Sequence, residues 1–456
     1  MFTKTILFLA CIFVPLTVYG EEITLARAVE LAIGHAPAMK EAEADRDVSA
    51  QDMRIGLAGL LPRINATGSY QHRRHKTRYD GTQNVFQPDL RSHDSTVGLR
   101  ATQPLFDLER WAGYRQGTLS AETGEMKLRL ERQRLLLETA QAYLDVVTAQ
   151  AGLRAARAKE TAAERLSLQA QAKFEAGGVA ANERLDADAR HDLARAEQFV
   201  ADNSLNQANA RLASLTGVAA EGILPPTISE ELSLPSSAQA KAWELRAAEN
   251  AISVRLAHLQ FRAAQAEELK VLGSGMPKVE AFAALEGGRA TTGQLGIGER
   301  TRDQTVGVQA SVPLFAGGGD WARVQKSRRA SLKAEFALQD DVRLARLTAR
   351  QALFGYEASI SQLQAMRKAV VSAKEASEAA RMGHEVGLRT VTEVLDADEL
   401  RFDAQKKLTE AEAQFVFAAL QLQASAGELD VRPILEVFGA DNFRDAAFNP
   451  LRQADR

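Results

Sequence analysis

The segment EAGGVAANERLDAD, residues 175–188, recurs as EVGLRTVTEVLDAD at residues 385–398. Seven positions are identical in one ungapped register, in which Gly177 corresponds to Gly387, 210 residues later. Each copy places a glycine between two long segments without proline, which is the pattern of one helix ending and another beginning. The sequence therefore predicts two helical hairpins of similar design.

A second pair of segments extends the repeat beyond the hairpins. TVGLRATQPLF at 96–106 matches TVGVQASVPLF at 305–315, and PRI at 62–64 matches PKV at 277–279. The matches occur in the same order in both halves of the chain, which a chance likeness between two helices would not produce. We infer an internal duplication whose unit contains strands followed by a hairpin.

Four segments alternate between apolar and small polar residues, the period of a β-strand. They lie at about 64–71, 96–102, 279–285 and 305–312, the third being weaker because Phe282 interrupts its polar face. Proline lacks an amide donor, so Pro104 and Pro313 are expected to end their strands. One apolar and one polar face suit a membrane barrel with a wet lumen. They suit a soluble sheet with one buried face equally well.

Very long helices are expected after the strands, since residues 107–174 and 320–386 contain no proline. At 1.5 Å per residue each would span roughly 100 Å. Their stripes of alanine predict close, coiled-coil-like packing. The returning helices are expected to end near Gly217 and Gly427.

The composition excludes several classes of protein. Of 456 residues, 45% are apolar and 25% charged, and the net charge is −3 with acids and bases interleaved. This balance gives no bulk electrostatic case for binding nucleic acid. No set of nucleophile, base and orienting residue is apparent, so neither an enzyme nor a cofactor is predicted. His72, His75 and His93 lack metal-ligand spacing and are expected in or near an exposed loop.

The N-terminus has the features of a secretory signal. Lys4 precedes an apolar run from Ile6 to Leu16, and Gly20 offers a small residue for cleavage. The only cysteine, Cys11, lies inside this run, so no disulfide, thiol site or lipid-anchored cysteine is expected. No later apolar run approaches the ~20 residues of a membrane helix. A membrane location would then require a β-barrel, and four strands need further copies to close one.

The duplication predicts a mixed, mostly α fold built from two internal repeats. The predicted parts are a signal peptide (1–20), a first repeat of helix, strand pair and hairpin (21–217), a connector (218–245), a second repeat (246–427) and a C-terminal tail (428–456).

Three features resemble the TolC-like outer membrane efflux protein family: the run 385–398, the two Pro-Leu-Phe strand ends, and the opening helix at 24–32. The resemblance covers nearly the whole chain after the signal. It implies a homotrimer whose chains share one twelve-stranded outer-membrane β-barrel, continued by a periplasmic α-helical barrel. The connector and the tail would form an equatorial belt. The function implied is passive export, by tripartite efflux or type I secretion, from a periplasmic adaptor and an inner-membrane pump.

The resemblance also implies roles for residues at the hairpin tips. Acids that constrict the periplasmic entrance correspond to Glu183, Asp186, Glu393 and Asp396. An arginine that bonds to the other hairpin and holds the entrance closed corresponds to Arg389, and His384 stands where the family has a tyrosine. The adaptor-docking turns correspond to Ala176, Gly177, Gly178, Val386, Gly387 and Leu388.

Structural roles compete with these assignments. Thr390 and Glu393 fit a capping box, and acids in the first turn of a helix also favour its dipole, so Glu393 and Glu183 suit a structural role. Asp186 and Asp396 lie beyond the cap and are better entrance candidates. Asp188 and Asp398, two residues further along, are expected to face solvent.

Two rival functions remain to be considered: a periplasmic coiled-coil adaptor or scaffold, and an enzyme with a helical domain. Adaptors typically carry one hairpin flanked by β-rich domains, and this chain has two. A further hypothesis is that a basic loop between the first two strands binds the phosphates of lipopolysaccharide. Its residues are Arg73, Arg74, Lys76, Arg78 and Arg91.

Overall fold

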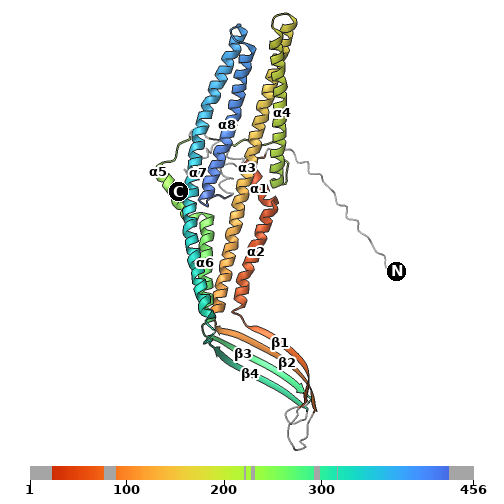
Figure 1. Cartoon of the computed structure of the whole chain (residues 1–456), viewed down its shortest axis with the longest axis vertical. Coiled ribbons are helices and arrows are strands. Elements are labelled where there is room, and N and C mark those ends of the chain that lie inside the picture. The colour runs from red at the N-terminus through yellow and green to blue at the C-terminus, as the bar shows by residue number, and fades with distance from the viewer. Residues whose placement is uncertain are drawn as a thin grey trace, which may run out of the picture. The chain divides into compact units, whose positions relative to one another are not determined.

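The computed structural model describes residues 23–76, 89–219, 222–226, 228, 232–291, 298–315 and 317–430. The predicted signal peptide, Arg78 and residues 431–456 of the predicted tail lie outside this part of the chain. Within it the fold is mostly helical with four antiparallel strands, as predicted (Figure 1). The first repeat contains α1 (Leu25–His35), α2 (Pro37–Ala58), β1 (Arg63–Lys76), β2 (Asp89–Phe106), α3 (Leu108–Glu175) and α4 (Ala181–Thr216). The remaining elements are α5 (Ser237–Asn250), α6 (Ile252–Ser274), β3 (Lys278–Ala290), β4 (Glu299–Ser311), α7 (Gly319–Glu385) and α8 (Val391–Ser425).

The four strands form one sheet in the order β1-β2-β3-β4. The central pairing of β2 with β3 joins the two repeats and places Leu99 opposite Leu285. The prediction for Pro104 is wrong, because β2 continues to Phe106 through a register shift between these two residues. A bulge accommodates a residue that cannot donate to the ladder. Pro313 does follow the end of β4.

The first two strands are longer than the alternating pattern predicted. His72 and His75 lie in β1 and His93 lies in β2, so these histidines are strand residues. The expectation of a loop was wrong because polar residues occupy both faces at this end of the strands. An apolar–polar alternation cannot mark a strand where neither face is apolar.

The chain forms two compact units, and each contains parts of both repeats. The first unit comprises Met1–Met39, Arg132–Ala247 and Leu347–Arg456, and the second comprises Lys40–Glu131 and Ala248–Arg346. Among the described helices, none has an apolar stretch of the length needed to cross a bilayer.

In the second unit, α2 and α3 pack very closely through small residues. A Cβ on Gly117 would lie 2.3 Å from the backbone oxygen of Asp52, and one on Gly56 would lie 2.7 Å from the Cα of Tyr114. Only glycine permits this approach at either position. Ser120 adds a hydrogen bond of 2.6 Å to Asp52. Close packing through small residues is present here, but it depends on glycine where the prediction named alanine.

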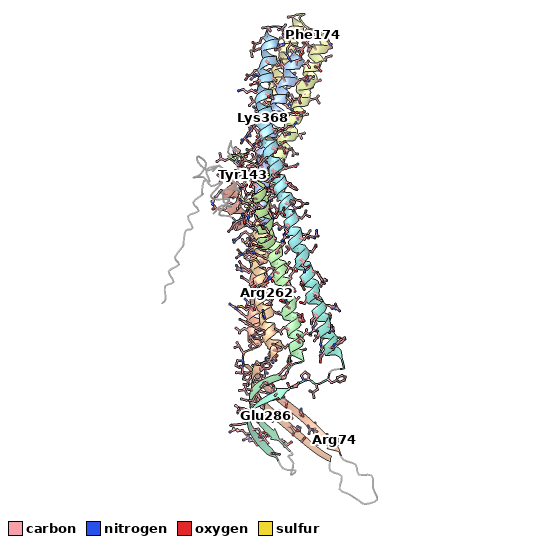
Figure 2. The ribbon with its side chains drawn as sticks, turned by 90° about the vertical axis from the view of Figure 1, so that its left-hand side faces the viewer. Arg74, Tyr143, Phe174, Arg262, Glu286 and Lys368 are labelled. Carbon is pink, nitrogen blue, oxygen red and sulfur yellow. The ribbon has the colours of Figure 1, made fainter. Side chains whose placement is uncertain are left out.

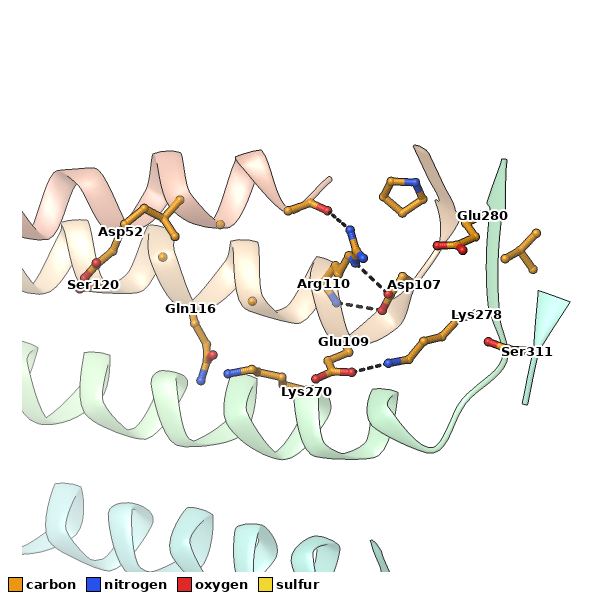
Figure 3. Close-up of a pocket in the computed structure, with 17 residues that line it drawn as sticks. Asp52, Asp107, Glu109, Arg110, Gln116, Ser120, Lys270, Lys278, Glu280 and Ser311 are labelled. Atoms are coloured by element: carbon orange, nitrogen blue, oxygen red, sulfur yellow. Dashed lines mark hydrogen bonds and ion pairs between the residues drawn. The ribbon is translucent and has the colours of Figure 1, made fainter. Parts of the chain in front are cut away.

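A cavity of about 680 Å³ lies where the strands of the second unit meet its helices (Figure 3). Its charged groups largely pair with one another. Arg110 contacts Asp107 at 3.1 Å and donates to the carbonyl of Gly59 at 3.0 Å, while Lys278 contacts Glu109 at 2.6 Å. These bonds fix the directions in which β2 and β3 leave the helices.

The core of the first unit surrounds Tyr143 of α3, which is buried together with Trp243 and Tyr356 (Figure 2). The Tyr143 hydroxyl donates to the carbonyl of Ile23 at 3.0 Å and also to that of Leu224. Burial raises the pKa of this hydroxyl above its usual range, so it stays a donor. The segment around Leu224, inside the predicted connector, is thereby tied to the long helix.

Candidate functional site

The two hairpins of the first unit end in turns of the same construction. Gly177 and Gly387 adopt left-handed backbone conformations, with φ of 73° and 78°. The amide of Gly178 donates to the carbonyl of Lys173 at 2.7 Å, and the amide of Leu388 donates to that of Gly383 at 2.8 Å. This is the glycine-dependent motif that closes a helix C-terminus. The repeated glycine therefore marks two matching helix stops, as predicted.

The two turns differ in the side chains that they expose. Val386 and Leu388 in the second turn are 69% and 83% exposed. The corresponding residues of the first turn, Ala176 and Gly178, present little apolar surface. Exposed large apolar side chains at a turn are a feature of contact sites. The second turn thus has the stronger features of a docking surface.

The helices that follow the turns begin differently. The Thr390 hydroxyl accepts from the amide of Glu393 at 3.3 Å, and the Glu393 carboxylate accepts from the amide of Thr390 at 2.8 Å. The predicted capping box is confirmed. The bond from the Thr390 amide, and next one from the Thr390 hydroxyl to the same carboxylate, lower the pKa of Glu393. The first copy has Ala180 at the cap position, without a side-chain bond, and Glu183 belongs to no such box.

Arg190 of α4 brings together two of the four acids predicted to line the entrance. Its guanidinium lies 3.2 Å from Asp186 on the same helix and 3.0 Å from Asp396 on α8. Burial alone would lower the pKa of Arg190, but the hydrogen bonds to both carboxylates outweigh it and raise the pKa. The two carboxylates therefore share one fixed positive charge.

Arg389 makes different contacts from those predicted. Its guanidinium lies 3.9 Å from Glu393, one turn along the same hairpin, and its carbonyl accepts a hydrogen bond from Nδ1 of His384 at 2.9 Å. Both predicted closing residues therefore stay within the second hairpin. Arg190, in contrast, bridges the two hairpins of one chain through Asp396.

Lys159 of α3 forms a second link between the hairpins. Its ammonium lies 3.1 Å from Glu399 and 3.0 Å from Asp403, both on α8, and 3.7 Å from Glu197 on α4. Burial alone would lower the pKa of Lys159, but its bonds to Asp403 and Glu399 raise it. Both links place the cation on the first hairpin and the acids on the second.

The prediction that Asp398 faces solvent is wrong. Asp398 is 3% exposed, and its carboxylate accepts from the Ser377 hydroxyl at 2.5 Å and from Arg381 at 2.7 Å. Asp188 in the first hairpin is half-buried and accepts in the same way from Ser167 and Arg184, at 2.7 and 2.8 Å. In both copies the aspartate faces the opposite arm of its own hairpin, where a serine 21 residues earlier in the chain donates to it.

Neither Arg190 nor Lys159 is among the residues predicted from the sequence. Arg190 stands four residues after Asp186, which is the spacing of an ion pair on one helix. At the matching place in the second repeat the chain has Leu400, so this charge is not part of the duplication. Nothing in the sequence shows that Lys159 lies beside α8, because that contact depends on how the hairpins pack.

No metal site is evident in the described ranges, where no group of histidine, cysteine, aspartate and glutamate has a suitable arrangement. The tip has paired ions, helix caps and exposed apolar turns. The charged groups can attract or repel other charges, and the exposed apolar turns can bind a partner. The ion pairs between the hairpins can break and re-form.

Comparison with known proteins identifies relatives over most of the chain. The family model described as "Outer membrane efflux protein" matches residues 28–218 and 234–428, one match for each repeat. The outer membrane protein TolC of Vibrio cholerae is 27% identical over 416 residues, covering 91% of this chain and 92% of that protein. The alkaline protease secretion protein AprF of Pseudomonas aeruginosa is 29% identical over 409 residues, covering 88% and 83%.

Solved structures share the fold. The CmeC outer membrane channel of Campylobacter jejuni superposes with a TM-score of 0.75 at 16% identity, covering 90% of this chain and 88% of that chain.

Proposed function

Because this chain belongs to the outer membrane efflux protein family, we propose that it works as a homotrimer supplied by a periplasmic adaptor and an inner-membrane pump. The chain is a TolC-like outer-membrane channel for efflux or type I secretion, a non-enzymatic transporter whose helices extend into the periplasm. The rival functions of adaptor and enzyme are set aside, since both repeats match the channel family. The proposal concerns the assembly and its control.

The open edges of the sheet carry the proposal of a shared assembly. In the described chain β1 and β4 each pair on one side only, which leaves a row of backbone donors and acceptors on each outer edge. One face of the same sheet exposes large apolar side chains, with Val97 72% and Val306 86% exposed. Open edges are not tolerated in lipid. Strands of neighbouring copies would satisfy both edges, and three copies would give a twelve-stranded barrel.

The connector and the C-terminal segment support an equatorial belt. Ile23 forms a parallel bridge with Ile223, and Arg246 lies 3.9 Å from the ring centre of Trp243 and 3.5 Å from Glu428. These contacts hold part of residues 218–245 and the start of residues 428–456 against the first unit. We propose that the parts of the channel begin and end at the boundaries predicted from the sequence.

Closure of the periplasmic entrance would depend on the links between the hairpins. Arg190 and Lys159 bind acids of α8, so separating the hairpins requires both links to break. Asp396 would then lose its counter-charge and line the entrance as a free carboxylate, while Asp186 would keep Arg190, its neighbour on α4. Glu393 would keep capping α8 in either state.

The adaptor is proposed to dock on the second turn through Val386 and Leu388. A photo-crosslinking residue at Leu388 should capture the adaptor in intact cells. One at Phe199, exposed on α4 about 30 Å of helix from the first turn, should not. An adaptor that crosslinks equally from both positions, or from neither, would remove the turn from the docking surface.

A further inference from the structure

The two faces of the strand sheet carry different charges. Side chains alternate between faces along a strand, and the register places Tyr70 opposite Ser95 and His72 opposite His93. Contacts confirm the two faces: the Tyr70 hydroxyl lies 3.0 Å from Nδ1 of His93 on one, and Ser69 lies 2.7 Å from Thr96 on the other. We name them the Tyr70 face and the Ser69 face.

The Tyr70 face is apolar where the strands adjoin the helices of the second unit. Its large side chains there are all exposed, and they come from all four strands. They are Ile64, Val97, Leu99, Leu285, Val306 and Val308. Ile64 and Tyr70 are six residues apart, ~20 Å of strand. With the 35–45° tilt of barrel strands, this length spans roughly 15 Å along the membrane normal, more than half of the ~25 Å apolar band of an outer-membrane barrel.

At the level of Tyr70 the same face becomes basic. Five exposed arginines lie on it: Arg302 is level with Val97, Arg289 and Arg300 are level with Tyr70, and Arg74 and Arg91 lie four residues farther from the helices. We call them the basic rim: Arg74, Arg91, Arg289, Arg300 and Arg302. Arg74 faces Arg91 across β1 and β2, and Arg289 faces Arg300 across β3 and β4. Figure 2 shows Arg74 near this end of the sheet.

The acids of the sheet whose side chains the structure describes are on the Ser69 face. They are Asp94, Glu280, Glu286, Glu299 and Asp303. Among strand residues whose side chains the structure describes, the Tyr70 face has no aspartate or glutamate. The Ser69 face therefore contains both signs, since Arg63, Arg73 and Arg100 also lie on it, whereas the described charged side chains of the Tyr70 face are basic.

The two histidines lie between Tyr70 and the Arg74–Arg91 pair. The amide of His93 donates to the Thr291 hydroxyl at 2.6 Å, and its carbonyl accepts from the Thr291 amide at 3.0 Å. The backbone of His93 thus points toward β3, which makes His72 and His93 a non-hydrogen-bonded pair with close side chains. Their ring centres are 4.5 Å apart. The bonds to Thr291 therefore hold the backbone in place at the end of the strands where these polar side chains lie.

An apolar band that ends in arginine matches the boundary between hydrocarbon and phosphate in a membrane. Arginine binds phosphate through paired N–H groups, and each basic residue at an anionic lipid surface contributes ~1 kcal/mol. The helices extend into the periplasm, so the far ends of the strands are at the outer leaflet. We propose that the basic rim binds the phosphates of outer-leaflet lipids, those of lipid A. The proposal rests on the outer-membrane location and not on the trimer or the adaptor.

This assignment replaces the basic loop predicted from sequence. Arg73 lies on the Ser69 face, one residue from Arg74, and Arg78 is outside the described residues. The second repeat contributes Arg289, Arg300 and Arg302, which the loop hypothesis did not include.

The test uses the full chain purified in detergent, with bisphosphorylated lipid A as the probe and native mass spectrometry as the readout. Arg289→Gln, Arg300→Gln and Arg302→Gln together should lower lipid retention by on the order of tenfold or more. The matched control removes the same charge from the Ser69 face, through Arg63→Gln, Arg73→Gln and Arg100→Gln, and should retain lipid within about twofold of the unaltered protein. Equal losses in both variants, or a loss in neither, would overturn the proposal.

Further arms separate the headgroup from other sources of binding. Lysine at the same three positions should restore most of the retention, which shows that charge and not folding is lost. Lipid A without phosphates should bind equally to all variants. Retention by the unaltered protein should fall as salt rises from 50 to 500 mM, roughly the range over which ion pairs at a surface are screened. Salt-independent retention, or displacement by millimolar inorganic phosphate alone, would contradict a lipid headgroup site.

Discussion

Arg190 determines how charge is distributed where the two hairpins meet. It binds Asp186 on its own helix and Asp396 on the other hairpin, so two carboxylates share one cation. Without it, two like charges would remain with less compensation, which favours separation of the hairpins. Because these side chains are partly exposed, we expect the loss of Arg190 to shift the equilibrium between the closed and open states.

Arg190→Gln is therefore expected to raise single-channel conductance in planar bilayers severalfold. Arg389→Ser, which removes a contact within the second hairpin, should have a smaller effect. Arg195→Gln, which changes an arginine on the same helix that lies over Phe199, is the matched control and should conduct as the unaltered channel does. An unchanged Arg190→Gln channel beside an opened Arg389→Ser channel would assign closure to Arg389 instead.

Asp398 is a second position where one side chain holds two helices. Asp398→Ala leaves the Ser377 hydroxyl and Arg381 without their acceptor, and should lower the local stability of the second hairpin by about 1–3 kcal/mol. Hydrogen exchange of the α7 and α8 amides near the tip measures this. Asp188→Ala should cost less, because its side chain is 35% exposed where that of Asp398 is 5%. Equal amide protection in the Asp398→Ala and Asp188→Ala variants would show that burial of the aspartate does not determine the loss of stability.

At the scale of elements, the two returning helices differ in how they begin. α8 has a complete capping box and α4 has none. The pKa of Glu393 is lower in the folded chain than its ordinary value of 4.5. Its contribution to stability is therefore complete above the ordinary pKa and is lost as the pH falls through the lowered value.

Acidification should accordingly loosen the start of α8 and leave the start of α4 unchanged. Amide exchange at pH 6 and pH 3, corrected for intrinsic rates, would show protection of the first turn of α8 falling below about pH 4.5. Glu393→Gln should remove this pH dependence, because glutamine accepts the Thr390 amide without a charge. A first turn of α4 that responds equally would rule out the capping box as the cause.

The elements themselves could be predicted from the sequence to a large extent. Glycines in a repeated register fixed the two turns, and period-two alternation found all four strands where one face is apolar. The ends of β1 and β2 were missed because arginine and histidine occupy the face that is apolar elsewhere. Arg190, Lys159 and the buried Asp398 were missed for a different reason. Their partners lie on other helices, at positions set by packing that a local pattern does not contain.

At the scale of the molecule, duplication explains both the helices and the sheet. Each repeat supplies two strands and one hairpin, and β2 with β3 joins the repeats. The sheet still has two open edges and an exposed apolar face, so one chain cannot satisfy it in lipid. The central claim is that neighbouring copies pair β1 of one chain with β4 of the next.

Disulfide crosslinking between the open edges tests this claim most directly. Cysteines at Asn65, Thr67 or Ser69 on β1 would each be combined with one at Thr305 on β4, in a chain whose own Cys11 lies in the predicted signal peptide. After oxidation of intact cells, at least one register should yield covalent dimers and trimers on denaturing gels. Thr96 of β2 paired with Thr305 is the control and should yield none. Monomer at every register, or equal crosslinking from the β2 control, would contradict a barrel shared between copies.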